Sequence, residues 1–233
     1  MPPQALIFDL DDTLFDDLGS TRAGLAGLAE VHPALKALPP AELLRRHAAA
    51  IAEREAQVYA KTLTPRQARV QRFEALLSAA GITNPDGELA AQQYRRAYRA
   101  AHTLNPGVLD VLEAIRERSL SIGVLTNYAR ETQQEKVRAL GLKPLIDALL
   151  TYDETPPKPD PRSYRAVCTA LDVSPGQAVM IGDHWRNDVA GAVAAGLRAV
   201  WYNPAGLEPP DSTPHTSLSS FIPLERALAV LLG

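Results

Sequence analysis

Five short apolar runs, rich in β-branched and aromatic residues, are separated by stretches of helical pattern, and this alternation constrains the fold most strongly. The runs are Ala5 to Phe8, Ile122 to Leu125, Ile146 to Leu150, Val179 to Ile181 and Ala199 to Tyr202. Strands that alternate with helices form βαβ units, which build a parallel sheet. Because the runs are apolar throughout, we expect helices on both faces of the sheet. The sequence therefore predicts an open, three-layer α/β core.

The first two runs are separated by more than a hundred residues, far more than an ordinary crossover needs. From Thr21 to His102 the pattern is helical, and Thr64 followed by Pro65 is a typical helix start. We therefore predict an all-helical domain over residues 16–102, inserted into a core made of residues 1–15 and 103–233. Within that core, the proline-rich segment from Asn203 to Pro223 is predicted as a loop before a final helix.

Composition excludes several classes of protein. The 233 residues carry 24 Lys and Arg against 27 Asp and Glu, so no broad basic surface for nucleic acid is expected. No run of about 18 apolar residues is present, so we predict no membrane segment. The start of the sequence lacks signal-peptide features, and the single cysteine, Cys168, fits a reducing compartment. These features predict a cytoplasmic protein. The sequence leaves open whether it is a monomer or a homodimer.

Polar residues follow the strand ends, where open parallel sheets bind ligands. After the first run, Asp9 and Asp11 are two positions apart, so their carboxylates can point to the same side. Such a pair repels itself unless Mg²⁺ neutralises it or one member holds a proton. Both conditions suit phosphoryl transfer, with one aspartate as nucleophile and the other as proton donor. The alternative is that Asp11 and Asp12 only stabilise a turn.

Two further strand ends offer groups that bind phosphate. Thr126 and Asn127 follow the second run and can donate hydrogen bonds to phosphate oxygens, or can simply cap the next helix. Lys158 lies among prolines in the sequence Pro156 to Pro161, which stiffen its loop. Its ammonium can cancel charge on a phosphate and a nucleophile; the alternative is a solvated surface lysine.

The fourth strand end carries Asp183 and Asp188, five positions apart in a loop that opens a helix. This spacing offers one inner metal ligand and one supporting carboxylate. The alternative is that Asp188 caps the helix. Nearby, Trp185 is a candidate wall of the site, and His184 is expected at the loop surface.

Read in order, these segments resemble the haloacid dehalogenase-like hydrolase superfamily, with its class I helical cap. The residues that carry the resemblance are Asp9-Leu10-Asp11-Asp12-Thr13, Thr126-Asn127, Lys158, and Gly182-Asp183 through Asp188. The match covers about residues 4–15 and 103–205, and the helical insertion lies where the family carries its cap. The resemblance implies a Rossmann-like core and a phosphatase that acts on a small phosphorylated metabolite.

The resemblance also implies a role for each residue. Asp9 is the expected nucleophile, forming an aspartyl-phosphate, and Asp11 is the expected general acid and later base. Mg²⁺ is expected to bind the carboxylates of Asp9 and Asp183 and the backbone carbonyl of Asp11, with Asp188 supporting this shell and orienting Lys158. Thr126, the backbone near Asn127 and Lys158 are expected to hold the phosphoryl group.

Several alternatives stay open within and beyond the family. The family's dehalogenases have a non-acid where Asp11 stands, which argues against that reaction here, whereas phosphomutases keep both acids. Thr126-Asn127 with Gln133, Gln134 and Lys136 resembles the branch of pyrimidine 5′-nucleotidases and N-acylneuraminate-9-phosphate phosphatases, although Tyr128 replaces a small residue. A phosphoglycolate phosphatase fits equally well, so the expected substrate is a nucleotide, a sugar phosphate or phosphoglycolate.

Two readings from other classes are a receiver-like signalling protein phosphorylated on Asp153 and a non-catalytic scaffold. A receiver is about half this length and has no helical insertion. Substrate choice is expected to lie in the helical domain, although surface and packing roles are the simpler explanation for its candidate residues. These candidates are Arg22, Arg45, Arg46, Tyr94, Arg95 and Tyr98.

Overall fold

The computed structural model describes residues 2–233 and divides the chain into two compact units. One unit contains Met1–Asp16 and Thr103–Gly233, and the other contains Asp17–His102. Each unit has its own apolar core. Among the described residues, no helix is both long enough and apolar enough to cross a membrane.

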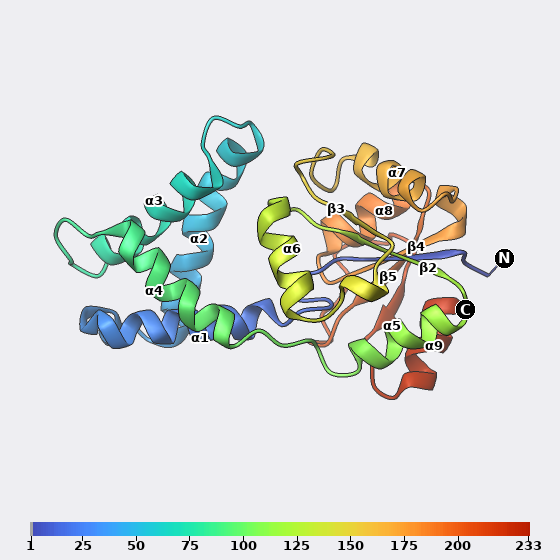
Figure 1. Ribbon diagram of the computed structural model, residues 1–233, viewed down its shortest axis with the longest axis horizontal. Coiled ribbons are helices and arrows are strands. Elements are labelled where there is room, and N and C mark those ends of the chain that lie inside the picture. The colour runs from blue at the N-terminus through green and yellow to red at the C-terminus, as the bar shows by residue number, and fades with distance from the viewer. Residues whose placement is uncertain (1) are drawn as a thin grey trace. The chain divides into compact units, whose positions relative to one another are not determined.

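The larger unit is built on a six-stranded parallel sheet with the order β3-β2-β1-β4-β5-β6 (Figure 1). The strands are β1 (Ala5–Phe8), β2 (Ser121–Leu125), β3 (Ala148–Leu150), β4 (Ala178–Gly182), β5 (Arg198–Tyr202) and β6 (Thr216–Leu218). The α/β prediction is confirmed, and the five predicted strands are present with shifts at their ends. The sixth strand contradicts the predicted loop from Asn203 to Pro223.

The missed strand has a simple physical explanation. Thr216–Leu218 is only three residues long and mostly exposed, so it shows neither an apolar run nor a clear alternation. It exists because its backbone pairs with the edge of β5, where Val200 is opposite Thr216. Backbone pairing of this kind depends on the neighbouring strand and leaves no side-chain pattern in the sequence.

Helices cover both faces of this sheet, as its apolar strands require. They are α5 (Val108–Glu117), α6 (Arg130–Ala139), α7 (Pro161–Ala170), α8 (Gly191–Ala194) and α9 (Leu224–Leu232). The unit also contains the short 3-10 helices η2 (Lys143–Leu145) and η3 (Pro175–Gln177) and the π-helix η4 (Trp185–Ala190). Figure 1 shows α7 and α8 on one side of the sheet and α5 and α9 on the other. Ile7 packs with Tyr164 and Val167 of α7 in the core on the first side.

The smaller unit is entirely helical. It contains α1 (Asp17–Val31), the turn η1 (Pro33–Ala37), α2 (Pro40–Tyr59), α3 (Pro65–Ser78) and α4 (Gly87–Ala100). The predicted start of α3 is present as a capping box, in which the Thr64 hydroxyl accepts from the Gln67 amide and the Gln67 side chain accepts from the Thr64 amide. Its core gathers Leu28, Phe73 and Tyr94. Whether this unit acts as a cap stays a prediction.

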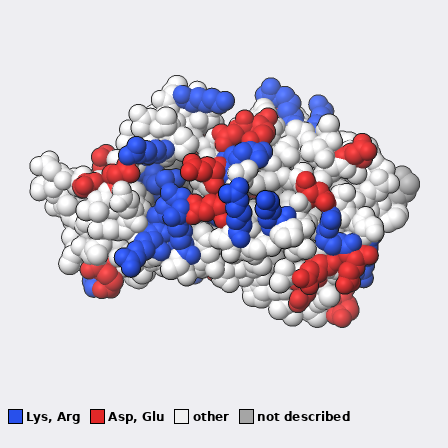
Figure 2. Space-filling view, viewed as in Figure 1, with Lys and Arg blue, Asp and Glu red and all other residues white. Residues whose placement is uncertain are grey.

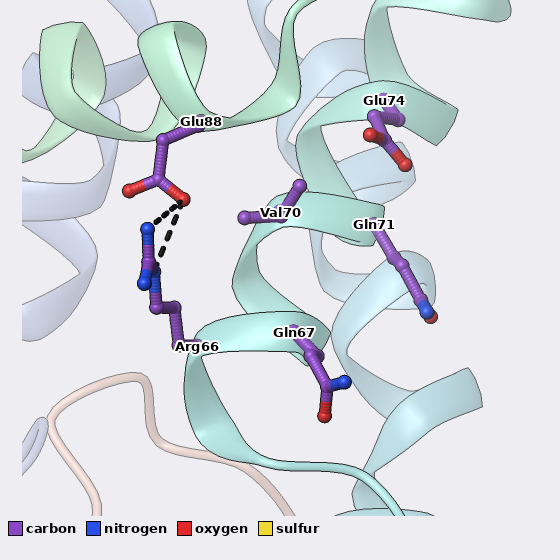
Figure 3. A pocket seen from close by; sticks show the side chains of 6 residues that line it. All are labelled: Arg66, Gln67, Val70, Gln71, Glu74 and Glu88. Carbon is purple, nitrogen blue, oxygen red and sulfur yellow. Dashed lines mark hydrogen bonds and ion pairs between the residues drawn. The ribbon is translucent and has the colours of Figure 1, made fainter.

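Charged side chains of both signs are interspersed on the face seen in Figure 2. A surface pocket in the helical unit is lined by Arg66, Gln67, Val70, Gln71, Glu74 and Glu88 (Figure 3). Within it, the Arg66 guanidinium is ion-paired with the Glu88 carboxylate at 3.2 Å. The candidate chemistry identified from the sequence lies elsewhere, in the α/β unit.

Candidate active site

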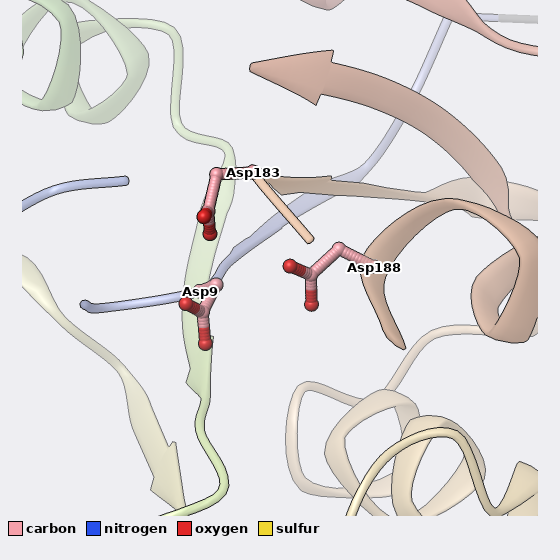
Figure 4. A group of neighbouring side chains, drawn as sticks. All are labelled: Asp9, Asp183 and Asp188. Carbon is pink, nitrogen blue, oxygen red and sulfur yellow. The ribbon is translucent and has the colours of Figure 1, made fainter. Parts of the chain in front are cut away.

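The carboxyl ends of β1 and β4 lie side by side in the sheet. Asp9 directly follows β1, and Asp183 directly follows β4. The backbone amide of Asp9 donates to the carbonyl of Ile181 at 2.8 Å, so the residue after β1 is held against β4. The carboxylates of Asp9, Asp183 and Asp188 gather there, with one oxygen of each within 4.8 Å of the others (Figure 4). The parallel pairing of two strands therefore brings together acids that are far apart in sequence.

Lys158 lies at the centre of the charge arrangement. Its Nζ donates to Asp9 Oδ1 at 2.6 Å and to Asp188 Oδ1 at 2.7 Å, and the residue is only 4% exposed. Its backbone is held by Asn127, whose Nδ2 donates to the Lys158 carbonyl at 2.8 Å and whose Oδ1 accepts from the Lys158 amide at 2.7 Å. A solvated surface lysine is therefore excluded. The side chain of Asn127 holds the lysine loop, a contact that the sequence did not suggest.

Asp188 is completely buried inside η4. Its Oδ2 accepts from the backbone amide of His184 at 3.0 Å, while its Oδ1 is bound by Lys158. Gly182 leaves the space for this carboxylate, because a Cβ there would lie 2.3 Å from Asp188 Oδ2. Asp188 thus orients the lysine, and its carboxylate is one of the three that lie together with those of Asp9 and Asp183.

Asp183 is held by two residues that the sequence analysis did not assign to the site. The Thr13 hydroxyl accepts from the Asp183 amide at 3.1 Å and donates to its Oδ1 at 3.4 Å. The indole Nε1 of Trp201 donates to the Asp183 carbonyl at 2.8 Å. Thr13 belongs to the first motif, so its position was a usable signal; Trp201 lies in β5 and gave none.

Asp11 lies in a separate arrangement from the three gathered carboxylates. Its Oδ1 accepts from Lys136 Nζ at 2.6 Å, and its Oδ2 accepts from Gln133 Nε2 at 2.9 Å. Gln133 Nε2 also donates to the hydroxyl of Thr126 at 2.7 Å. The structure therefore joins Asp11 to Thr126 through α6. The expected metal contact of the Asp11 carbonyl stays a prediction.

Burial and neighbouring charges shift the pKa values of the clustered aspartates and of Lys158. Burial raises the pKa of Asp9 well above its usual range, an effect that Lys158 opposes and that Asp188 and Asp183 reinforce. Burial, followed by the charge of Asp188, raises the pKa of Asp183 to about 7. Burial disfavours the charged form of Lys158, but the carboxylates of Asp188 and Asp9 outweigh this effect and raise its pKa.

The donor set fits Mg²⁺. When ionised, the three carboxylates face a single ammonium, which leaves two negative charges in a largely buried place. Carboxylate oxygens are the ligands that this hard divalent cation prefers. A divalent cation would balance the excess charge and lower the raised carboxyl pKa values.

The remaining candidates have structural roles in this arrangement. Asp153 accepts from the Arg130 amide at 2.8 Å, at the start of α6. His184 is exposed, as expected, and its Nδ1 accepts from the Asn187 amide. The Trp185 ring packs edge-on against Trp201 and His215, so it belongs to an aromatic cluster at this end of the sheet.

Two of the residues proposed for substrate contact in the helical unit have clear packing roles. Tyr94 is buried and donates to Thr21, and Tyr98 donates to Asp17. Arg45 and Arg46 both bind Glu42 on their own helix, at 2.7 and 2.6 Å. The expectation that surface and packing contacts are the simpler explanation agrees with these observations. Roles for Arg22 and Arg95 stay predictions.

The model of the haloacid dehalogenase-like hydrolases matches residues 3–196. This chain belongs to that family. It is 36% identical to a phosphoserine phosphatase of Thermus thermophilus, over 88% of this chain and 90% of that protein. It is 30% identical to the N-acylneuraminate-9-phosphatase of Rattus norvegicus, over 97% of this chain and 93% of that protein.

A solved structure of the HAD-hydrolase YfnB from Bacillus subtilis, bound to magnesium, has the same fold. Its TM-score is 0.80 at 24% identity, and the match covers 99% of each chain. Structures of haloacid dehalogenases are also similar to this family member. The predicted resemblance to HAD-like hydrolases, and to their phosphatases in particular, is confirmed by these comparisons.

Proposed function

We propose that this HAD-like hydrolase is a Mg²⁺-dependent phosphatase that hydrolyses a small-molecule phosphate monoester through an aspartyl-phosphate on Asp9. The observation that carries the proposal is the buried Lys158 ammonium shared between Asp9 and Asp188, beside the Asp183 carboxylate. This arrangement concentrates positive and negative groups where phosphoryl transfer needs positioning and charge compensation.

The first step follows from the two aspartates. Lys158 binds Oδ1 of Asp9, so we assign Oδ2 as the oxygen that forms the new bond to phosphorus. The phosphorus–oxygen bond of the ester breaks, and the leaving oxygen takes a proton from Asp11. In the second step, water gives a proton to Asp11, and the water oxygen bonds to phosphorus. The bond between Asp9 and phosphorus breaks, which releases inorganic phosphate and restores the Asp9 carboxylate.

Other residues hold the reacting groups. Lys158 and Thr126 are proposed to bind the phosphoryl oxygens, together with the backbone near Asn127. Mg²⁺, bound by Asp9, Asp183 and the Asp11 carbonyl and supported by Asp188, would supply charge neutralisation during the transfer. We also propose that the helical unit is the cap that selects the substrate.

The substrate class follows from the relatives. Proteins similar to this chain are named as phosphatases of phosphoserine, N-acylneuraminate 9-phosphate and phosphoglycolate. We therefore propose a small phosphorylated metabolite, and an assay panel should contain these compounds together with nucleotides and sugar phosphates. We propose a cytoplasmic enzyme, a monomer or a homodimer.

Two other reactions of the superfamily are less well supported. Asp11 supplies a proton donor that displacement of a halide does not need, so dehalogenation is disfavoured. A phosphomutase would return the phosphoryl group to a sugar, and would release little inorganic phosphate. A receiver phosphorylated on Asp153 is disfavoured because that carboxylate is hydrogen-bonded to the start of α6.

The test is phosphate release from the panel with Mg²⁺, using the Asp9→Asn variant and Asp153→Asn as a matched control. We expect wild-type turnover, loss of turnover in Asp9→Asn, and retention of most activity in Asp153→Asn. Acid quench during turnover, followed by mass spectrometry of the peptide that contains Asp9, should show a phosphoryl adduct. Full activity in Asp9→Asn, or an adduct on Asp153, would contradict the proposal.

A further inference from the structure

Two side chains of α6 contact the site but have no role in the mechanism above. Gln133 and Lys136 are one helical turn apart, so they lie on the same face of α6. Gln133 is fully buried and Lys136 is only 4% exposed. Burying a lysine and a glutamine destabilises the folded protein unless the polar atoms of each are paired. The partners of these two side chains therefore indicate what each one does.

Gln133 uses both hydrogens of its amide nitrogen. One is donated to Asp11 Oδ2 at 2.9 Å and the other to Thr126 Oγ1 at 2.7 Å. A hydroxyl that accepts from a neighbour still has its own hydrogen to donate. Because Gln133 holds Thr126 as an acceptor, the Thr126 hydrogen can be directed to an oxygen of the phosphoryl group.

The orientation of this amide is fixed by the charge on Asp11. Gln133 Oε1 is buried and has no hydrogen-bond partner among residues 2–233. A reversed amide would place that oxygen against the Asp11 carboxylate and would lose both donated bonds. The structure therefore leaves one acceptor unpaired in order to keep two donors on Asp11 and Thr126.

Lys136 holds the other oxygen of the same carboxylate. Its Nζ lies 2.6 Å from Asp11 Oδ1, and 4.9 Å from the centre of the Phe15 ring. It also lies 5.5 Å from the centre of the Tyr128 ring. Aromatic faces attract a cation without accepting a full hydrogen bond. The ammonium thus lies near two aromatic rings and is ion-paired with the Asp11 carboxylate.

We propose that Gln133 and Lys136 are positioning residues, which fix the Asp11 carboxylate and direct the Thr126 hydroxyl to the transferring phosphoryl group. The inference rests on the proposed function, because it assigns Asp11 the proton transfers and Thr126 the phosphate contact. It adds that α6 couples the two, so that the acid and the phosphate-binding hydroxyl are aligned by one side chain.

The two residues make different predictions. Lys136 donates a hydrogen bond to Asp11, so Lys136→Met should slow an alkyl phosphate, which needs a proton on its leaving group, by about 10- to 100-fold. The same variant should affect p-nitrophenyl phosphate much less, because its leaving group needs little protonation. Gln133 contacts both groups, so the near-isosteric Gln133→Glu should lower kcat on both substrates, by about 100-fold on the alkyl phosphate.

The helix supplies a matched control. Gln134 is the neighbouring glutamine, only partly buried, and it lies on a different face of α6. Gln134→Leu should therefore leave kcat and KM near their wild-type values on both substrates. A second control is the Asp11→Asn background, in which Lys136→Met should add little further loss, because the carboxylate that it positions is already absent.

The melting temperature of each variant should be measured first. Should Lys136→Met fail to fold, Lys136→Arg keeps the cation and should give an intermediate kcat on the alkyl phosphate, with KM less changed. The inference is overturned if the Gln133 and Lys136 variants match Gln134→Leu, or if Lys136→Met slows both substrates equally. A wild-type protein that releases no phosphate from any substrate would overturn the proposed function, and this inference with it.

Discussion

The side chains of Lys158 and Asp9 lie 2.6 Å apart although 149 positions separate them in the sequence. The same ammonium lies 2.7 Å from Asp188, which comes 30 positions later. One cation is thus shared by two buried carboxylates, and its single positive charge does not neutralise both of them. This deficit is the physical basis for the proposed Mg²⁺ site and for the predictions below.

Removing the shared cation should damage both catalysis and stability. In Lys158→Met, we expect kcat to fall by about 100- to 1,000-fold, because a charge at the transferring group is lost. Breaking a buried ion pair on one side typically costs about 3–5 kcal/mol, so the free energy of unfolding should fall as well. Chemical denaturation with and without Mg²⁺ measures this loss, and Mg²⁺ should recover part of it.

The exposed Lys143 provides the comparison. Lys143→Met should leave both kcat and the free energy of unfolding close to the wild-type values. Equal effects of the two substitutions would show that the position of Lys158 has no special importance.

A methyl group at Gly182 should disturb Asp188. The Cβ of Gly182→Ala would lie 2.3 Å from Asp188 Oδ2, so the carboxylate must move away from Lys158 or the strand must shift. Overpacking of this kind costs about 1–3 kcal/mol. We expect a lower melting temperature, a lower kcat and weaker Mg²⁺ binding.

Gly176→Ala serves as the matched substitution, because a Cβ at Gly176 meets no atom within 4 Å. Its melting temperature and Mg²⁺ affinity should remain near those of the wild type. The steric explanation would be wrong if Gly182→Ala bound Mg²⁺ as tightly as Gly176→Ala does.

Mg²⁺ should stabilise the protein more at alkaline than at acidic pH. Burial raises the pKa of Asp183 to about 7 and that of Asp9 well above its usual range. A carboxyl group with a raised folded-state pKa contributes most stability at low pH, and this contribution is lost as the pH rises from the unfolded value of about 4 through the folded one. In the proposed site, Mg²⁺ would bind the ionised carboxylates, so it should recover stability in the range where they lose protons.

The measurement is the rise in melting temperature on adding Mg²⁺, at about pH 5 and about pH 8. We expect the larger rise at the higher pH and a much smaller one in Asp183→Asn. Fluorescence of Trp201, which donates to the Asp183 carbonyl, offers a second signal for binding. An equal rise at both pH values would contradict the competition between protons and metal.

His47 should make the helical unit less stable in acid. Burial lowers the pKa of this histidine to about 3, and the charge of Arg72 adds to the effect while Asp17 opposes it. The unfolded chain therefore binds a proton below about pH 6.5, whereas the folded chain does not until the pH is much lower. Below about pH 6.5, the free energy of unfolding should therefore decrease by up to about 1.4 kcal/mol for each pH unit of acidification.

The check is chemical denaturation between about pH 7 and about pH 4, with His47→Phe as the comparison. His47 packs against the rings of Phe73 and Tyr94, so a phenyl ring suits its surroundings. The difference in unfolding free energy between the two proteins should shift in favour of the variant as the pH falls. A difference that is independent of pH would refute the role of His47 protonation.

The sequence was sufficient for the architecture where local patterns are strong. Apolar runs such as Val179 to Ile181 mark buried strands, and Thr64 followed by Pro65 marks a helix start, because both depend on neighbouring residues alone. The edge strand at Thr216–Leu218 was missed because it has only three residues, of which the first two are polar and exposed, so it carries no periodic pattern. Its pairing with β5 is a property of the assembled sheet.

The same division holds for the site. The chemical groups that follow the strand ends were predictable from the sequence: the carboxylates of Asp9 and Asp183, and the loop that carries Lys158. Tertiary structure decided how they pair, including the bonds of Asp11 to Gln133 and Lys136 and of Trp201 to Asp183. Such contacts depend on strand order, register and the direction of each side chain, which form only when segments distant in the chain pack together.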